Sequence, residues 1–108
     1  MKRLSNFRFS SRVEIHVKSW IRVEDGVFRS VQSGDLSPEG ARLRLDFALS
    51  VGQDLVLCLK LGQEAPVAVS ARVVWAAGGC AGVQFTDKNQ MAYRRLRRFH
   101  WVEFCKAA

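Results

Sequence analysis

A short stretch of the chain, residues 35–40, combines a carboxylate, a hydroxyl and a glycine, at Asp35, Ser37 and Gly40, with a proline between them. Proline presets φ, and a glycine two residues later permits a positive φ or the close approach of another backbone or a ligand. We therefore predict a tight turn from which the side chains of Asp35 and Ser37 face outward.

These two side chains have a specific chemical use and an ordinary one. An ionised carboxylate accepts two N–H donors at once, which matches the Watson–Crick edge of guanine, and a hydroxyl can donate to a phosphate oxygen. Asp and Ser also cap and brace ordinary turns by bonding the nearby backbone. In isolation, Asp35 and Ser37 are more simply explained as turn residues.

Arg8 and Arg12 lie upstream of this stretch, four positions apart. In an extended chain they share one side and lie about 13 Å apart, so each could hold a different part of one dinucleotide-sized anion. A guanidinium binds phosphate or a guanine edge with two hydrogen bonds and stacks on bases. The spacing alone has little specificity, because Arg94 and Arg98 repeat it further along the chain.

The size and composition indicate one folded domain. A chain of 108 residues is long enough for a single modest core, and 48% hydrophobic with 25% charged residues is typical of a globular protein. No apolar run approaches the roughly 20 residues that span a bilayer, so no membrane span is expected. The basic N-terminus is not followed by a hydrophobic segment, which predicts no secretory signal and a cytoplasmic protein.

The formal net charge of +7 predicts an anionic partner. Nucleic acid, a nucleotide, an acidic protein surface and a membrane surface all remain candidates on this ground. Charge alone does not choose among them.

The cysteines and histidines give no indication of a metal site or a catalytic centre. Cys58, Cys80 and Cys105 are odd in number and contain no Cys-x-x-Cys pair, which argues against disulfides and zinc. His16 and His100 are far apart and are interpreted as ordinary surface imidazoles. Since no nucleophile–base pair or carboxylate dyad stands out either, we expect neither an enzyme nor a metal or cofactor.

Short alternating segments separated by turns indicate a mostly β fold. In residues 12–18, Val13, Ile15 and Val17 share one face, as expected for a half-buried strand. In residues 67–75, the same parity predicts Val73 and Trp75 on the inner face. Six such segments suggest a closed or nearly closed antiparallel barrel, which would leave no aggregation-prone edge. The predicted strands are residues 12–18, 27–34, 41–47, 55–61, 67–75 and 81–85.

The last segment changes to helical periodicity and predicts a C-terminal helix over residues 87–104. Asp87 is placed to cap it, with Gln90 completing a capping box. An apolar stripe would lie across the barrel and plug one end. The basic exterior of Arg94, Arg95, Arg97 and Arg98 is either a solvated face or part of a contact with a partner or an acidic surface. The stripe consists of Met91, Ala92, Leu96, Phe99, Val102 and Phe104. We thus predict a flexible basic arm, residues 1–11, and a single domain, residues 12–108.

Taken together, Arg-x-x-x-Arg at 8–12 and Asp-x-Ser-x-x-Gly at 35–40, in this order among barrel strands, closely resemble the PilZ family of bacterial cyclic di-GMP receptors. Residues 73–75 and 82–85 are also similar to the last two strands of that family. The resemblance covers about residues 7–86. It implies a split-barrel fold, cyclic di-GMP as ligand, and a downstream protein partner in motility, adhesion or polysaccharide secretion.

The resemblance also implies roles for individual residues. Arg8 and Arg12 match the arginines that grip the phosphates and contact the guanines of the ligand. Asp35 and Ser37 match the acidic and hydroxyl positions that meet a guanine edge and line the pocket. Gly40 matches the glycine that allows the turn.

Two positions stay open. Trp75 stands where some relatives stack an aromatic ring on guanine, but its parity with Val73 favours a core tryptophan. Phe7 stands where many family members have another basic residue, a position associated with binding one cyclic di-GMP molecule or a stacked pair. The ligand stoichiometry is therefore not predicted.

The resulting hypothesis is a receptor whose arm folds onto the turn when cyclic di-GMP bridges them, which changes the surface offered to a partner. It would be a monomer or a ligand-linked dimer, with no DNA partner. One alternative is a small basic barrel that binds single-stranded nucleic acid through its arginines and Trp75. Another is a PilZ-like adaptor that has lost ligand binding.

Overall fold

The computed structural model describes residues 17–23, 26–88 and 90–107. The predicted arm, with Arg8 and Arg12, lies outside the described residues. So do the first part of the predicted strand 12–18 and His16. The expectation that the arm is flexible therefore stays a prediction.

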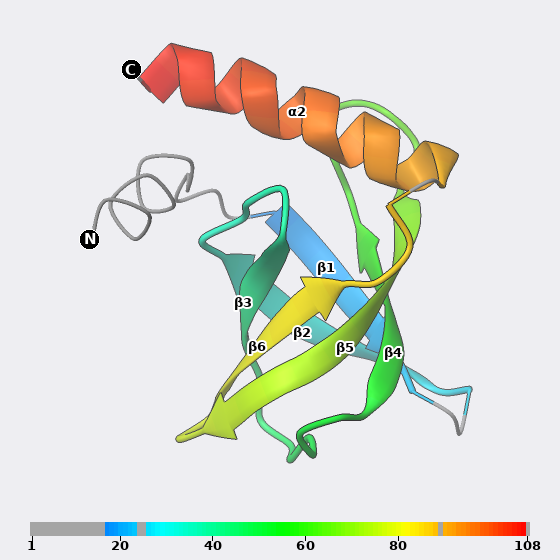
Figure 1. Ribbon diagram of the computed structural model, residues 1–108, viewed down its shortest axis with the longest axis vertical. Helices are drawn as coiled ribbons and strands as arrows, with labels where there is room; N and C mark the ends of the chain where they lie inside the picture. The colour runs from blue at the N-terminus through cyan, green and yellow to red at the C-terminus, as the bar shows by residue number, and fades with distance from the viewer. Residues whose placement is uncertain (1–16, 24–25, 89, 108) are drawn as a thin grey trace.

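The described residues form six antiparallel strands that close into a barrel in the order β1-β2-β3-β6-β5-β4 (Figure 1). Closure is made by β1 and β4, where Ser19 faces Leu59 and Arg22 faces Val56. Because each strand pairs on both sides, the barrel has no free edge among these strands. The predicted six-stranded antiparallel barrel is confirmed. The strands are β1 (Val17–Arg22), β2 (Phe28–Gly34), β3 (Gly40–Arg44), β4 (Asp54–Leu59), β5 (Val67–Ala77) and β6 (Cys80–Phe85).

Alternation along the strands builds the core, because successive side chains point to opposite faces of a sheet. In β4 and the residue pair that follows it, the four predicted inward leucines are all buried: Leu55, Leu57, Leu59 and Leu61. Val83 and Phe85 of β6 are buried as predicted. Arg42 and Arg44 of β3 face outward and are exposed.

The first strand differs from its prediction. It continues to Arg22, beyond the predicted end at residue 18, and buries Ser19 and Ile21. The alternation is hard to see in the sequence here because a serine occupies an inward position. Ser19 is accommodated by hydrogen bonding, since its Oγ lies 2.8 Å from Ser33 Oγ and 2.9 Å from the Val17 carbonyl oxygen.

Helix α2 (Met91–Ala107) lies across one end of the barrel (Figure 1). It begins at Met91, later than the predicted residue 87. The amide of Arg94 donates to the carbonyl of Gln90 at 3.2 Å, which places Gln90 directly before the first helical residue. Gln90 therefore occupies the cap position, and the predicted cap at Asp87 is wrong.

The buried stripe of α2 also differs from the prediction. Tyr93 and Leu96 are buried, and the Tyr93 ring contacts Phe85 edge-on at 5.9 Å. Met91 and Val102, predicted to face the barrel, are exposed instead. Leu96 is buried and Ala92 and Phe99 pack against the core as predicted, so the stripe differs from the prediction in gaining Tyr93 and in exposing Met91 and Val102.

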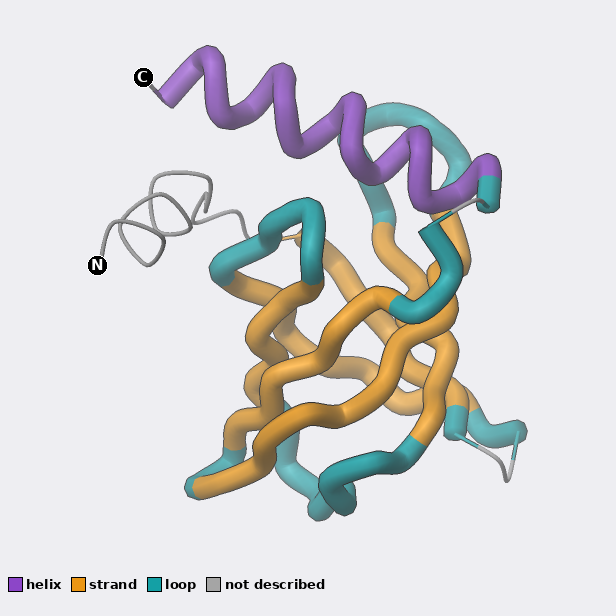
Figure 2. The backbone as a smooth tube through the Cα atoms, viewed as in Figure 1, coloured by secondary structure: helices purple, strands orange, loops and turns teal. Residues whose placement is uncertain are grey.

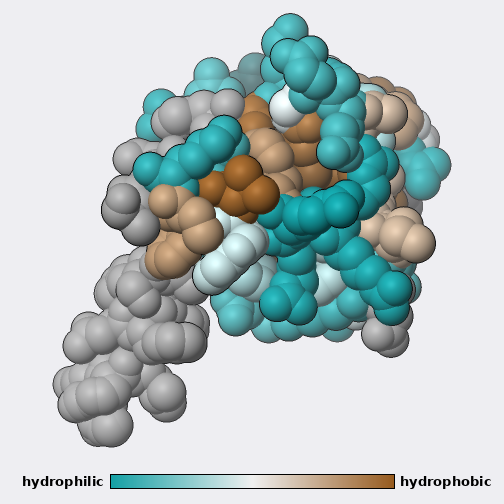
Figure 3. Space-filling view, turned by 90° about the horizontal axis from the view of Figure 1, so that it is seen from above, coloured by the Kyte–Doolittle hydropathy of each residue, from teal (hydrophilic) through white to brown (hydrophobic). Residues whose placement is uncertain are grey.

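The C-terminal half of α2 carries three neighbouring aromatic rings. His100, predicted to be a surface imidazole, is buried, and its ring stacks on Phe104 with 6.1 Å between centroids. Trp101 is exposed and also stacks on Phe104. Seen from the end that the helix covers, apolar side chains form a patch bordered by hydrophilic ones (Figure 3). Within the described residues, no helix has the length and apolar character needed to cross a membrane.

Two loops on the helix side of the barrel attach α2 (Figure 2). Arg95 Nη2 donates to Glu64 Oε1 at 2.7 Å and to the Ala65 carbonyl at 3.0 Å. The hydrogen bond and charge of Arg95 lower the pKa of Glu64. The Tyr93 hydroxyl donates to the Pro38 carbonyl at 2.6 Å, which ties the helix to the turn of residues 35–40.

We predict that Leu96→Ala lowers the free energy of unfolding by about 2–5 kcal/mol, because Leu96 is 0% exposed and its loss leaves a cavity under the helix. Urea unfolding followed by far-UV circular dichroism measures the change. Val102→Ala on the exposed side of the same helix should stay within about 0.5 kcal/mol of wild type. Equal effects of the two substitutions would contradict the packing described above.

Candidate functional site

A pocket of about 380 Å³ lies on the outer wall of the barrel, over β3, β6 and the second half of β5. Asp35, Ser37, Gly40 and Trp75, all of them site residues predicted from the sequence, line it together. Trp75 is far from the other three in the sequence, and the antiparallel β3–β6–β5 arrangement brings them together. Arg8 and Arg12 lie outside the described residues. The pocket is also lined by Glu39, Ala41, Arg42, Val74, Gly82, Val83 and Gln84.

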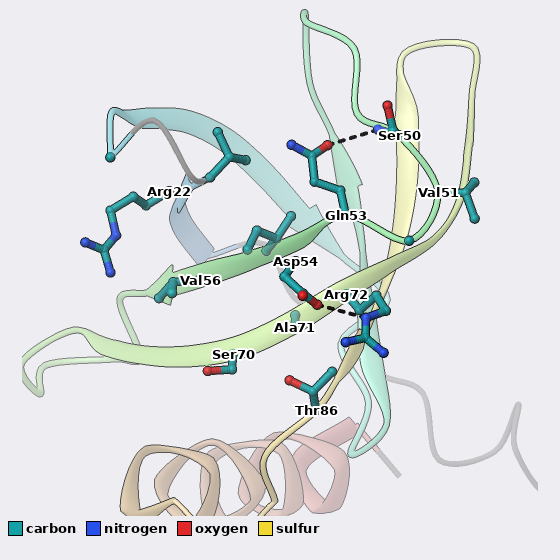
Figure 4. Close-up of a pocket in the computed structure, with 14 residues that line it drawn as sticks. Arg22, Ser50, Val51, Gln53, Asp54, Val56, Ser70, Ala71, Arg72 and Thr86 are labelled. Carbon is teal, nitrogen blue, oxygen red and sulfur yellow. Dashed lines mark hydrogen bonds and ion pairs between the residues drawn. The ribbon is translucent and has the colours of Figure 1, made fainter.

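A larger depression of about 950 Å³ lies elsewhere, over the outer faces of β4 and β5 (Figure 4). Its main charged feature is the exposed ion pair between Arg72 Nε and Asp54 Oδ1 at 2.8 Å. None of the residues predicted from the sequence to bind a ligand lines it. Size alone therefore does not identify the candidate site.

Asp35 has a left-handed backbone, with φ of 45°. Asp is one of the few residues that adopts this conformation, at a cost of about 1–2 kcal/mol for most L-residues. It redirects the chain directly after β2 and leaves the carboxylate at the pocket. There, Asp35 Oδ2 lies 3.2 Å from Arg42 Nη2.

Ser37 is turned inward rather than outward, which corrects the prediction. It is 7% exposed, and its Oγ accepts hydrogen bonds from the amides of Glu39 and Gly40, both at 3.2 Å. The backbone of the same turn closes with the Ser37 amide donating to the Gly40 carbonyl at 2.9 Å. Ser37 therefore braces the turn while also lining the pocket.

Gly40 is required for close approach. A Cβ at this position would lie 1.9 Å from the carbonyl oxygen of Val83 in the neighbouring strand. The amide of Phe85 donates to the Glu39 carbonyl at 2.8 Å just beside this contact. Of the two uses of this glycine considered from the sequence, the structure selects contact with another backbone.

Trp75 is not a core residue, although its parity with Val73 favoured the core. In the β5–β6 register Val73 faces Val83, but Trp75 faces Gly82, the very next residue, so β5 contains a bulge at Val74. The bulge places both Val74 and Trp75 on the outer face, where they are 46% and 43% exposed. The indole therefore lines the pocket instead of filling the barrel.

Gly82 makes room for this indole. A Cβ on Gly82 would lie 2.0 Å from Trp75 Nε1, so the ring rests directly on the glycine backbone. Gly82 and Gln84 were not predicted as part of the site. The ion pair between Arg42 and Asp35 was not predicted either. A glycine inside a strand is a sequence signal for such a close approach, and it was the one available clue.

Among the residues that the structure describes, no group of three or more His, Cys, Asp or Glu side chains is placed to hold a metal ion. The chemistry that the pocket offers is hydrogen bonding by a carboxylate, charge from Arg42 and stacking on an indole.

A six-stranded antiparallel barrel with a helix across one end, and with a pocket beside the β2–β3 turn, defines the structural class of the protein as a small closed β-barrel. The family model of the PilZ domain matches residues 6–100. The chain belongs to the PilZ domain family.

Solved structures share this fold. The PilZ domain of CeSA from a cellulose-synthesizing bacterium is 20% identical, with a TM-score of 0.72 over 84% of this chain and 95% of that one. The PilZ domain of YcgR from Escherichia coli, solved with cyclic di-GMP, is 16% identical, with a TM-score of 0.71 over 89% and 90%.

The inhibitor of motility MotI/DgrA from Bacillus subtilis is 14% identical, with a TM-score of 0.74 over 88% of this chain. The match covers 50% of that protein, so this chain spans about half its length. No curated protein matches the chain. At these identities, the solved structures show a shared fold.

We predict that Gly82→Ala displaces the Trp75 indole, because the added methyl group and the ring cannot occupy the same space. In a background where Trp20 and Trp101 are replaced by Phe, the emission spectrum of Trp75 should shift relative to the parent. Gly34→Ala is the matched control, since a methyl group there meets nothing within 4 Å. An unchanged spectrum in Gly82→Ala would contradict the stacked arrangement.

We also predict an alkaline loss of stability that depends on Tyr93. Burial raises the pKa of Tyr93 above its ordinary value of 10.0, so the folded protein holds the phenolic proton more tightly than the unfolded chain. This contribution to stability is complete below the unfolded pKa and is lost as the pH rises through the folded pKa.

Urea unfolding between about pH 9 and pH 11 measures this effect. The free energy of unfolding should fall more steeply in wild type than in Tyr93→Phe, which has no proton to lose. Burial also raises the pKa of Cys58, but that thiol is present in both proteins and cancels in the comparison. Parallel pH profiles would overturn the prediction.

Proposed function

We propose that the protein is a cyclic di-GMP receptor, not an enzyme, and that it signals by changing the surface it offers to a partner protein. The observation that carries this proposal is the convergence of Asp35, Ser37, Gly40 and Trp75 on one pocket of a PilZ domain. The E. coli YcgR PilZ domain, which shares the fold, was solved with cyclic di-GMP.

Asp35 would recognise the guanine edge. Its carboxylate has acceptor positions beyond the one that Arg42 occupies, so it can accept guanine N–H groups while keeping that ion pair. Arg42 would hold the carboxylate in place before the ligand arrives. Because the Asp35 carboxylate is already held in place, less side-chain entropy is lost when the ligand binds.

Trp75 would stack on a guanine base. Its indole is exposed on the pocket wall and backed by Gly82, so one ring face rests on the protein and the other is available. Ser37 would act mainly by holding the turn, because its hydroxyl already bonds the backbone there.

Arg8 and Arg12 would complete the site by binding the phosphates. We propose that cyclic di-GMP draws this part of the chain onto the turn of residues 35–40 and shifts the population toward that closed form. The nearby bond between Tyr93 and the turn offers a route by which closure reaches helix α2.

Isothermal titration with cyclic di-GMP tests the proposal, with GTP and a short oligonucleotide as control ligands. Arg12→Ala and Asp35→Asn should each weaken binding tenfold or more, because each removes charge-assisted bonds worth about 1.5–3 kcal/mol. Arg44→Ala is the matched control, an exposed arginine on the same strand as Arg42 but outside the pocket. Equal affinities of wild type, Arg12→Ala and Asp35→Asn would reject this site.

The same titration separates the alternatives. A stoichiometry of one or two ligands per chain reports whether Phe7 permits a stacked pair, and sedimentation of the complex reports a ligand-linked dimer. A PilZ-like adaptor without ligand would give no binding heat. A nucleic-acid barrel that uses this pocket would bind the oligonucleotide with a steep salt dependence and no preference for guanine.

A further inference from the structure

A second surface, which combines aromatic and cationic side chains, lies on the outer face of β1 and β2. It consists of Lys18, Trp20 and Arg22, the outward residues of β1, and Phe28, which starts β2. We call these four residues the β1 face. Phe28 is 56% exposed and Trp20 is half-buried, so large rings are available to solvent on the wall of the barrel.

The strand register sets the spacing of the two rings. Trp20 faces Ser30 and Arg22 faces Phe28 in the antiparallel pair, so Trp20 and Phe28 are diagonal neighbours. Diagonal positions of this kind are about 7–8 Å apart, within reach of adjacent aromatic side chains. The Arg22 guanidinium lies over the Phe28 ring, 5.7 Å from its centroid.

The β1 face is positively charged. Among the described residues, neither Lys18 nor Arg22 forms an ion pair, whereas the nearest acid on β4, Asp54, is paired with Arg72. Lys60 lies close by, but its ammonium donates to the Glu64 carbonyl and is not counted as part of the face.

Two shallow depressions, which share no lining residue, border this face. One of about 690 Å³ runs along β1 and β2 and is lined by Lys18, Trp20, Ser30 and Gln32. The other is the larger depression of Figure 4, in which Arg22 lies at one end. The first depression provides hydroxyl and amide groups, from Ser30 and Gln32, beside the Lys18 ammonium.

The β1 face is separate from the cyclic di-GMP pocket. The pocket lies over β3, β6 and β5, whereas β1 pairs with β2 and β4. In Figure 1, β1 runs behind β5 and β6, across the barrel from them. A ligand on one surface therefore does not occupy the other.

We propose that the β1 face binds single-stranded nucleic acid, with bases stacking on Trp20 and Phe28 and phosphates meeting Lys18 and Arg22. Rings flanked by cations on a strand surface are the typical platform for unpaired bases. A duplex would hide its base faces, and this face carries no helix to enter a major groove. A polypeptide of Asp and Glu alone would neutralise the cations but offers no ring to stack on the two aromatic side chains.

Fluorescence anisotropy with labelled twelve-nucleotide dT and U strands tests the proposal on the full chain. Two phosphate contacts predict that binding weakens about sevenfold when the salt rises from about 50 to 200 mM. Trp20→Ala and Phe28→Ala should each weaken binding by at least about fivefold. The exposed Phe28 provides a variant expected to fold even where Trp20→Ala does not.

Matched controls separate this surface from others. Trp101→Ala removes an aromatic ring that is 63% exposed on α2 and should leave the affinity unchanged. If Trp75→Ala abolished binding and Phe28→Ala did not, the nucleic acid would bind in the cyclic di-GMP pocket instead, and the proposal would be overturned.

Two further outcomes would also overturn it: no anisotropy change with either strand at low salt, and equal binding of a polyglutamate chain, which would assign the face to an acidic protein. The result is independent of the proposed receptor function, because it requires no cyclic di-GMP. An unchanged far-UV circular dichroism spectrum and urea midpoint in Phe28→Ala would show that a loss of nucleic-acid binding is not a loss of folding.

Discussion

The contact between Gly40 and the carbonyl oxygen of Val83 is the constraint on which the candidate site depends. Only a residue without a Cβ lets β3 approach β6 this closely. The turn of residues 35–40 ends at this contact, so its position on the barrel wall is fixed by backbone packing. Ser37 from within the turn and Tyr93 from the helix then hold that geometry. Asp35 reaches the pocket because these contacts position the turn of residues 35–40 beside it.

A second glycine has a matching role on the other side of the pocket. Gly82 lies next to Val83 in β6, and the absence of its side chain allows the Trp75 indole to lie flat against the sheet. The bulge at Val74 is what brings the indole to this face at all. The pocket is therefore a product of two glycines and one extra residue in a strand. Its polar groups come from a turn that these backbone contacts hold in place.

This explains which parts of the molecule were predictable from the sequence. Leu55, Leu57 and Leu59 alternate regularly, and alternation reports directly which face of a strand is buried, so the barrel could be predicted. Trp75 could not be placed, because a bulge changes parity by one residue and carries no strong local signal. The prediction that Ser37 faces outward was wrong because local sequence does not show how a turn packs. A turn sequence reveals that a hydroxyl bonds the backbone, but not which way the turn packs.

The helix illustrates a different limit. Its existence followed from periodicity, but the start predicted from Asp87 relied on a short capping pattern that several residues in a polar stretch can satisfy. Tertiary packing decided the outcome, since burying Tyr93 against Phe85 fixes the rotation of the helix and exposes Met91. Local signals place a helix to within a turn, and the partner surface sets its rotation.

The closed barrel also limits which elements can couple ligand binding at one surface to binding at another. Each described strand is bonded on both sides, so its position in the barrel is held by two neighbouring strands. Coupling between sites requires an element with two states that both ligands favour differently. Outside the ladder, the turn of residues 35–40 lines the pocket, and helix α2 is bonded to that turn through Tyr93 and Pro38. Under the proposed receptor function, the bond between Tyr93 and Pro38 would link the pocket's turn to the helix end of the barrel, whereas the β1 face lies on strands that do not line the pocket.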